Sequence, residues 1–243
     1  MSISHDNIYA MLRTKVPPFE FNEEVVDVFT DMIERSVPGY SLTLPLIGLI
    51  ARRYAQANSN CYDLGCSLGA ATFAMRHHIT QPNCHIIGID NSAAMLNELQ
   101  SLLVKDEGEI PVSLREADIR DVAIENASVV VLNFTLQFID PEDRDLLIHR
   151  IYEGLRPNGV LILSEKVIFD DAEQNERLID LHHDFKRANG YSDLEISQKR
   201  TAIENVLIPE TIAQHQHRLR QVGFATADVW FQAYNFVSLL AIK

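Results

Sequence analysis

Short apolar runs alternate with amphipathic helical segments through the middle of this chain. The apolar runs predict buried strands over 61–64, 85–89, about 111–116, 128–132 and 160–163. Helical spacing predicts helices over 70–78, 92–104 and 140–155, the last beginning at a proline followed by acidic residues. Strands that alternate with helices form a parallel sheet with right-handed crossovers, so the pattern predicts an α/β fold.

The pattern changes before this alternating core. Helical spacing predicts helices over 23–37 and 41–55, and we assign residues 1–57 to an N-terminal helical lead. We expect residues 58–243 to form the α/β domain.

The pattern changes again after the fifth strand. Residues 167–205 are polar and helical, and we expect this insertion to cover the carboxyl edge of the sheet. A helix over 210–222 then precedes two β-rich runs, 226–231 and 235–242. Their short connection predicts an antiparallel hairpin, so the sheet is expected to be mixed.

The loop after the first strand is the most informative motif. Cys61-Tyr62-Asp63-Leu64-Gly65-Cys66-Ser67-Leu68-Gly69 joins a strand to a helix through two glycines four residues apart. Glycines let the backbone approach a ligand, and N–H groups at the helix start attract polar ligand atoms. A dinucleotide fingerprint would need glycine in place of Ser67. The spacing Asp63-x-Gly65-x-x-x-Gly69 instead resembles the first motif of enzymes that depend on S-adenosyl-L-methionine (SAM). A plain packing turn is the alternative, and Cys66 is expected there as a small residue rather than a nucleophile.

Polar residues follow the next strands at positions where a nucleoside ligand needs them. Asp90, followed by Asn91, is expected to accept the ribose hydroxyls, and a charge favoured at a helix start is the weaker alternative. Asp118 is placed to accept the adenine amino group and Ile119 to flank the base. Asn133 is placed to hold the methionine part. Carboxyl ends of parallel strands meet at one edge, so these residues are expected to share a site.

Composition and charge exclude some classes of function. Lys and Arg number 21 against 34 Asp and Glu, a formal net charge of −13. That balance argues against direct binding of nucleic acid, which requires basic surfaces. Three cysteines without Cys-x-x-Cys spacing are typical of reduced thiols, and the start of the chain lacks a signal pattern. We therefore expect a cytoplasmic protein with no membrane association.

The histidines do not predict a metal site. His182 and His183 are adjacent, so on a helix they point about 100° apart. His215 and His217 are two residues apart and do not share a helix face. Basic pairs in and after the insertion, such as Lys186-Arg187 and Lys199-Arg200, are usually solvated. If they face the cofactor cleft instead, they would suit a multiply charged acid.

Four segments together carry a family resemblance. They are Asp63 to Ala71, Asp118-Ile119-Arg120-Asp121, Val131 to Phe138, and His182-His183-Asp184-Phe185-Lys186-Arg187-Ala188-Asn189-Gly190-Tyr191. From about Phe21 onward the chain resembles the bacterial carboxy-S-adenosyl-L-methionine synthase family. The resemblance implies a Rossmann-like class I SAM-dependent methyltransferase fold, with a mostly parallel seven-stranded sheet, a C-terminal antiparallel hairpin and a helical cover.

The resemblance also implies an activity. Members convert SAM and prephenate to carboxy-SAM and phenylpyruvate, and the product serves a second enzyme that modifies a wobble uridine in tRNA. The implied partners are these small molecules and a second copy of the chain. The implied cofactor contacts are Tyr40, Gly65, Cys66, Ser67, Asp90, Asn91, Asp118, Ile119, Asn133 and Arg200.

The residues alone leave two other functions open. One is a SAM-dependent methyltransferase acting on a small carboxylic acid, and the other is a non-catalytic SAM-binding subunit. No catalytic side chain is predicted, because carbon dioxide transfer to the SAM methyl requires proximity and exclusion of water more than a protein nucleophile.

Overall fold

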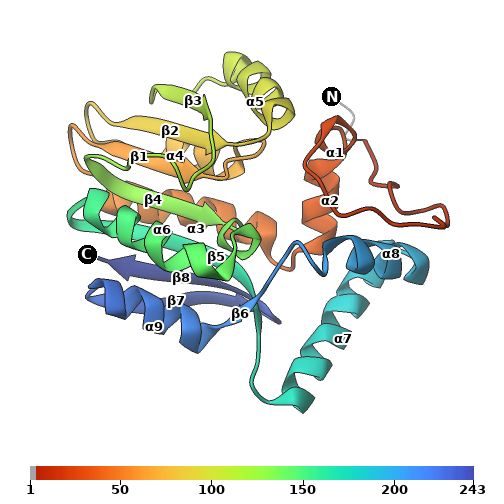
Figure 1. Cartoon of the computed structure of the whole chain (residues 1–243). Helices are drawn as coiled ribbons and strands as arrows, with labels where there is room; N and C mark the ends of the chain where they lie inside the picture. Colours follow the sequence, from red (N-terminus) through yellow and green to blue (C-terminus); the bar gives the residue numbers. More distant parts are fainter. Residues whose placement is uncertain (1–3) are drawn as a thin grey trace.

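A mixed β-sheet forms the centre of the molecule in this computed structural model, which describes residues 4–243 (Figure 1). Its strands, in spatial order, are β3 (Val112–Glu116), β2 (His85–Asp90), β1 (Asn60–Leu64), β4 (Ala127–Asn133), β5 (Leu155–Ile168), β8 (Phe236–Ile242) and β7 (Thr226–Ala233). The first five are parallel, while β8 runs antiparallel to β5 and β7 antiparallel to β8. The predicted mixed sheet is therefore confirmed, and the two-residue strand β6 (Glu210–Thr211) extends it beside the end of β5.

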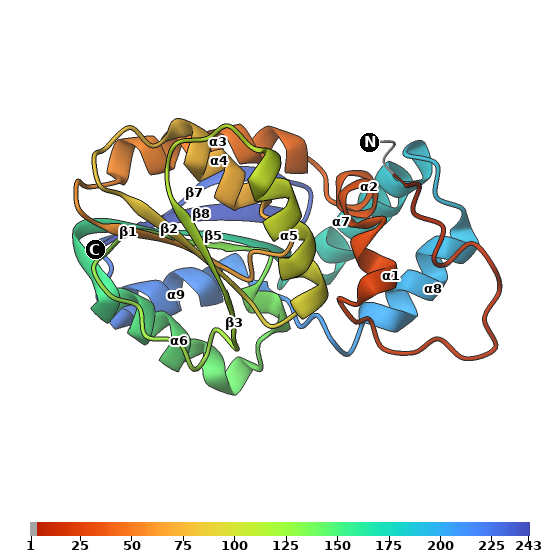
Figure 2. The same cartoon turned by 90° about the horizontal axis from the view of Figure 1, so that it is seen from above.

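Helices cover both faces of this sheet (Figure 2). The helices α3 (Tyr40–Tyr54), α4 (Ala70–His78) and α5 (Ala93–Lys105) lie on one face, and α6 (Pro141–Gly154) and α9 (Ile212–Val222) on the other. Fully buried side chains such as Ile47 and Met75 fill the first layer, and Leu132 and Ile148 fill the second. The helix α3 thus packs with the α/β layers, although it precedes residue 57.

Two elements differ from the expected ones. The fifth strand reaches Ile168 instead of Leu163, because the Glu165 carboxylate accepts the N–H groups of Leu136 and Gln137, both at 2.9 Å. A buried carboxyl group with such partners does not end a strand. The helix expected over 23–37 is divided into α1 (Glu23–Val26) and α2 (Phe29–Ser36). Several valines lie at the break, and valine has a modest helix propensity.

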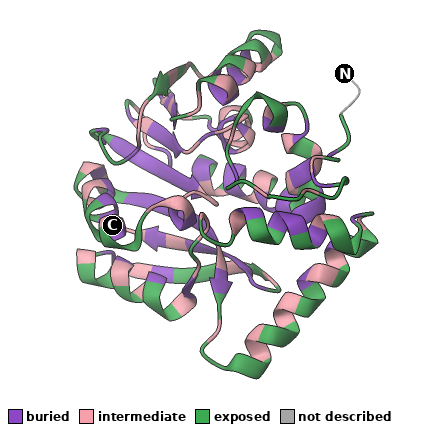
Figure 3. Cartoon of the chain, turned by 45° about the vertical axis from the view of Figure 1, so that its right-hand side comes forward, coloured by how far each residue is buried: buried purple, intermediate pink, exposed green. Residues whose placement is uncertain are grey.

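A separate group of helices lies beside the sheet, where the parallel strands end (Figures 1 and 2). It consists of α1, α2, α7 (Ala172–Ala188) and α8 (Asp193–Ile203), and we call it the cover. The cover therefore combines the N-terminal part of the chain with the expected insertion. Its outer surfaces are exposed, whereas the sheet strands are mostly buried (Figure 3).

The N-terminal segment fastens the cover from outside. The Gln198 side-chain amide on α8 donates to the carbonyls of Tyr9 and Met11, both at 2.9 Å. The Phe19 N–H donates to the Ala202 carbonyl at 3.0 Å. These bonds give residues 6–19, for which the sequence alone predicted no role, a defined place against α8. Within residues 4–243, no helix is long and apolar enough to cross a membrane.

Candidate active site

A cavity of about 670 Å³ lies between the carboxyl ends of the parallel strands and the cover. Strand order reverses between β1 and β4, the position at which open α/β sheets bind ligands. The cavity is lined by predicted residues from four successive strand ends and from α8, namely Gly65, Ser67, Asp90, Asn91, Asp118, Ile119, Asn133 and Arg200. The structure therefore brings together eight of the ten predicted cofactor residues in one space.

The glycine loop has the backbone geometry that its sequence predicted. Gly65 and Gly69 have φ values of +76° and +80°, in the left-handed region where a side chain is disfavoured. A β-carbon at Gly65 would also overlap the side chain of Thr135. Ser67 adopts a positive φ as well, and its N–H donates to Asp90 Oδ2 at 2.8 Å. The loop is thus held open toward the cavity by glycine geometry and by the second strand end.

Asp90 is a buried carboxylate with two backbone donors. Oδ2 accepts the Ser67 N–H and Oδ1 accepts the Ser92 N–H at 2.9 Å. Burial raises the pKa of Asp90, and the backbone hydrogen bonds oppose that shift. Each carboxylate oxygen has a second lone pair that can accept another hydrogen bond. The geometry therefore leaves Asp90 able to accept ligand hydroxyls from a fixed position.

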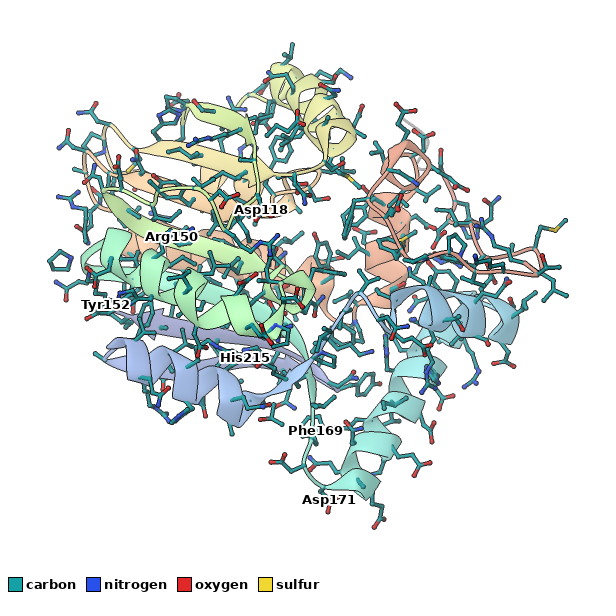
Figure 4. The ribbon with its side chains drawn as sticks, in the orientation of Figure 1. Asp118, Arg150, Tyr152, Phe169, Asp171 and His215 are labelled. Atoms are coloured by element: carbon teal, nitrogen blue, oxygen red, sulfur yellow. The ribbon has the colours of Figure 1, made fainter. Side chains whose placement is uncertain are left out.

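Asp118 lies at the same edge, and Figure 4 labels it there. Its Oδ2 pairs with Arg120 Nη2 at 2.7 Å, and Arg120 Nη1 pairs with Asp143 Oδ2 at 2.7 Å. The hydrogen bonds from Arg120 lower the pKa of Asp118, so the carboxylate stays charged. Ile119 is buried beside it, so this corner combines an acceptor for an amino group with an apolar surface for a base.

Asn133 ends β4 and carries a buried acceptor without a partner. Its Oδ1 is buried and has no hydrogen-bond partner among the described residues. Buried polar atoms are nearly always paired, and Asn133 lines the cavity, so this unpaired acceptor is a candidate partner for a ligand donor. The next residue, Phe134, has a φ of +62°, and its N–H donates to the Ser164 carbonyl at 2.7 Å. The amino group of a methionine moiety is a donor that fits this position.

Two predicted residues do not line the cavity. The Cys66 side chain is buried behind the glycine loop, 3.2 Å from where a β-carbon on Gly88 would lie. Burial raises the pKa of the Cys66 thiol, which agrees with a small packing residue rather than a nucleophile. Tyr40, the first residue of α3, is buried with its ring centroid 6.3 Å from that of Phe134. Its direct contact with a cofactor stays a prediction.

The cover and the end of β5 contribute cations to the opposite side of the cavity. Lys166 on β5, Lys186 on α7, and Lys199 and Arg200 on α8 all line it. Burial lowers the pKa of Lys186 to about 7, and that of Lys199 to about 8. Basic side chains of the insertion thus face the cleft in a protein whose net charge is −13. The sequence indicated Lys186 and Lys199 by composition alone and missed Lys166, which follows an apolar strand.

An aromatic surface adjoins these cations, and the sequence did not indicate it. The His182 ring packs edge-on against Phe236 with centroids 4.9 Å apart, and Phe236 packs against Phe134 at 6.0 Å. The His182 Nε2 atom lies 2.8 Å from the Ser36 carbonyl, and burial lowers the pKa of His182 to about 2. His182 is therefore a neutral wall residue at physiological pH.

The histidines form no metal site in the described part of the chain, where no metal-binding cluster is found. His215 is buried on α9, away from the cover (Figure 4), and burial lowers its pKa to about 4. His217, two residues later on the same helix, is exposed.

Comparisons with known proteins agree with this site. A methyltransferase domain family model matches residues 62–159. Carboxy-S-adenosyl-L-methionine synthase of Trichlorobacter lovleyi is 60% identical over 100% of both chains. The synthase of Aeromonas hydrophila is 61% identical over 98% of this chain and 96% of its own. This chain belongs to the carboxy-S-adenosyl-L-methionine synthase family.

The family relationship extends further than the sequence motifs predicted. It includes the first twenty residues, which we had not matched, because the Trichlorobacter lovleyi relative covers the whole chain. The N-terminal segment that fastens α8 is therefore part of the family's sequence. The resemblance expected only from about Phe21 is corrected in this respect.

Solved structures support the fold. Human N-acetylserotonin methyltransferase in complex with SAM superposes with a TM-score of 0.57 at 15% identity, over 91% of this chain and 55% of that chain. A Methanococcus maripaludis protein classed with SAM-dependent methyltransferases superposes with a TM-score of 0.57 at 19% identity, over 96% and 97%. At these identities the likeness shows the class I SAM-dependent methyltransferase fold alone.

Proposed function

We propose that this chain converts SAM and prephenate to carboxy-SAM, phenylpyruvate and water. The observation that carries the proposal is one cavity with a SAM-type strand edge on one side and four cationic side chains on the other. A methyltransferase that releases a neutral product has no need for such a cluster. A doubly charged acid such as prephenate needs cationic partners, because its carboxylates lose their hydrating water when they enter a partly apolar cavity.

The residues at the strand ends bind SAM, and the cover closes the cavity around the second substrate. Asp90 binds the ribose, Asp118 and Ile119 bind the adenine, and Asn133 binds the methionine part, which directs the methyl group toward the cover. When bound, SAM would supply a sulfonium that acidifies its methyl hydrogens. One methyl proton would leave with the hydroxyl group that the donor acid loses, as water, and the electron pair of that C–H bond would form the new bond to the carbon dioxide released beside it. The cover and the aromatic wall exclude water, which would otherwise compete and allow the carbon dioxide to escape.

Arg200 is the residue that we assign to the new carboxylate. It lines the cavity from α8, adjacent in sequence to Lys199. A guanidinium can bind a carboxylate through two parallel hydrogen bonds, which an ammonium cannot reproduce. Carboxy-SAM has this carboxylate and SAM does not, so Arg200 would favour the product form of the ligand.

Mass spectrometry of the ligand that copurifies with the protein tests the reaction. Cofactor with an added carboxyl group supports the synthase, and demethylated cofactor would support a small-acid methyltransferase. Unmodified SAM, with no conversion when prephenate is added, would instead support a non-catalytic SAM-binding subunit.

We also propose the cellular setting from the family relationship. The product is expected to supply a tRNA-modifying enzyme, and the chain is expected to work as a homodimer in the cytoplasm. Three cysteines, all buried and unpaired, support a reducing compartment. Sedimentation analysis of the purified chain tests the dimer, and a monomer at micromolar concentration would contradict it.

A further inference from the structure

Three lysines from different elements converge on the cover side of the cavity. Lys166 comes from β5, Lys186 from α7 and Lys199 from α8, and each of them lines the cavity. Lys199 has partners within the protein, since its Nζ donates to Ser36 Oγ at 3.1 Å and lies 3.9 Å from Asp6 Oδ2. Among residues 4–243, neither Lys166 nor Lys186 forms a salt bridge. Two cations therefore remain available to a ligand.

The position of these two cations is costly without an anion. Lys186 is 9% exposed, and Lys166 is half-buried. Taking an ammonium group out of water is unfavourable unless an opposite charge or several acceptors replace the water. The chain has 34 Asp and Glu residues, yet among residues 4–243 none lies within 4 Å of the Lys166 or Lys186 ammonium. The arrangement is that of an anion site.

An apolar surface lies directly beside the anion site. Lys166 is the register partner of Phe236 in the antiparallel pairing of β5 with β8, and directly paired residues present their side chains on the same face. Phe236 in turn packs against Phe134 and His182. A ligand that fits both features has a ring or similar apolar body and a carboxylate at one end.

We propose, resting on the reaction proposed above, that Lys166 and Lys186 are specificity-determining residues that bind the carboxylate that the donor acid keeps. The carboxylate that leaves as carbon dioxide loses its negative charge in the transition state. A strong ion pair with that group would stabilise the ground state more than the transition state and slow its loss. The retained carboxylate is charged throughout, so binding it anchors the donor without this penalty.

The charged groups around Lys186 couple the binding of a carboxylate to the uptake of a proton. The groups that face Lys186 are Lys199 on α8, Lys166 on β5, Asp6 in the N-terminal segment, and His182 and His183 on its own helix. Burial and the two lysines lower the pKa of Lys186 to about 7. A carboxylate beside it would raise that pKa again. Binding of a monocarboxylate near pH 8 is therefore expected to take up a proton.

Calorimetric titration of the full-length, SAM-loaded protein with phenylpyruvate tests the inference. Titrations in buffers of different ionisation enthalpy measure the proton uptake together with the affinity. Lys186→Met and Lys166→Met are expected to weaken phenylpyruvate binding about tenfold or more. Lys105→Met, an exposed lysine at the end of α5, is the matched control and should bind as the wild type does. Lys186→Arg should retain binding but lose the proton uptake, because a guanidinium does not titrate in this range.

Two further measurements keep the result interpretable. SAM affinity and melting temperature should be close to wild type in the lysine variants, which shows that the fold and the cofactor half are intact. Wild-type phenylpyruvate affinity in Lys186→Met and Lys166→Met would overturn the inference and leave the proposed reaction standing. Failure of the wild-type protein to form carboxy-SAM from prephenate would overturn both.

Discussion

The two sides of the cavity recognise charge by different means. The sheet side uses backbone geometry and carboxylates that are fixed by N–H donors, such as Asp90 with Ser67 and Ser92. The cover side uses four long cationic side chains, and within residues 4–243 only Lys199 among them lies within 4 Å of an acidic side chain. The first side can hold a ligand that is the same in every member of a large fold class. The second can be changed by a few substitutions, and we therefore expect it to determine the reaction.

The largest expected effect is a loss of carboxy-SAM affinity when Arg200, on the cover side, is replaced. Arg200→Ala should lose about 2–5 kcal/mol of affinity for carboxy-SAM. Affinity for SAM should change much less, because SAM lacks the added carboxylate. Arg200→Lys should also be damaging, since an ammonium cannot bind in two-pronged geometry. Calorimetry with both ligands, with melting curves as the folding control, measures the difference. Equal losses of under about 1 kcal/mol would make Arg200 a solvated helix charge.

The matching experiment on the sheet side concerns Asp90. Asp90→Ala should weaken binding of SAM and carboxy-SAM alike, by about 1.5–3 kcal/mol, through the loss of charged hydrogen bonds to the ribose. Asp90→Asn retains an acceptor and should lose less. Titration of both ligands checks this, and a loss confined to carboxy-SAM would contradict the division between the two sides.

A pH effect is expected behind the glycine loop, at Asp63. This carboxylate is 1% exposed, accepts the Thr72 hydroxyl at 2.6 Å, and burial raises its pKa to about 6. Between the ordinary aspartate pKa and about 6, Asp63 is protonated in the folded state and ionised in the unfolded state. The free energy of unfolding that Asp63 contributes therefore falls as pH rises through this window. The change amounts to about 2 kcal/mol. Denaturant unfolding of wild type and Asp63→Asn between pH 4.5 and 7 measures it, and parallel pH profiles would exclude it.

A smaller effect is expected at Asn133. Asn133→Ala removes the unpaired acceptor and should weaken SAM binding by about 1 kcal/mol, the typical worth of one neutral hydrogen bond. Removal of a buried atom without a protein partner should leave the melting temperature of the ligand-free protein nearly unchanged. Differential scanning fluorimetry with and without SAM tests both points. A large loss of stability without ligand would indicate a structural role instead.

We expect no appreciable binding of tRNA by this protein. The net charge of −13 opposes the binding of a polyanion. A filter-binding assay at physiological salt should therefore show no micromolar complex. Such a complex would revive direct modification of tRNA by this chain.

The sheet side was predictable from the sequence because each of its residues follows an apolar strand. The loop from Gly65 to Gly69, Asp90, Asp118 and Asn133 all appear at the ends of local patterns, and the topology brings such ends together. The parallel sheet and its hairpin were predictable for the same reason. The extra length of β5 was not, because the donors that satisfy Glu165 come from another loop.

The cover was only partly predictable, because its contacts join distant parts of the chain. Nothing local in α7 indicates that Lys186 and Lys166 face one cavity, or that His182 packs on Phe236 from the last strand. The role of residues 6–19 was missed for the same reason, since Tyr9 and Phe19 find their partners on α8. The helical pattern placed 167–205 over the carboxyl edge of the sheet, and the family resemblance added site positions, but neither gave the contacts.

The attachment of the N-terminal segment to α8 has a consequence for synthesis on the ribosome. Tyr9 and Phe19, which are buried in the finished protein, leave the ribosome long before Gln198 and Ala202, their hydrogen-bonding partners, have been made. Domains generally begin folding from the N-terminus during translation, but this segment must wait for nearly the whole chain. Its closure is therefore a late step in assembly, and chains that terminate early would expose these aromatic side chains to chaperones and proteases.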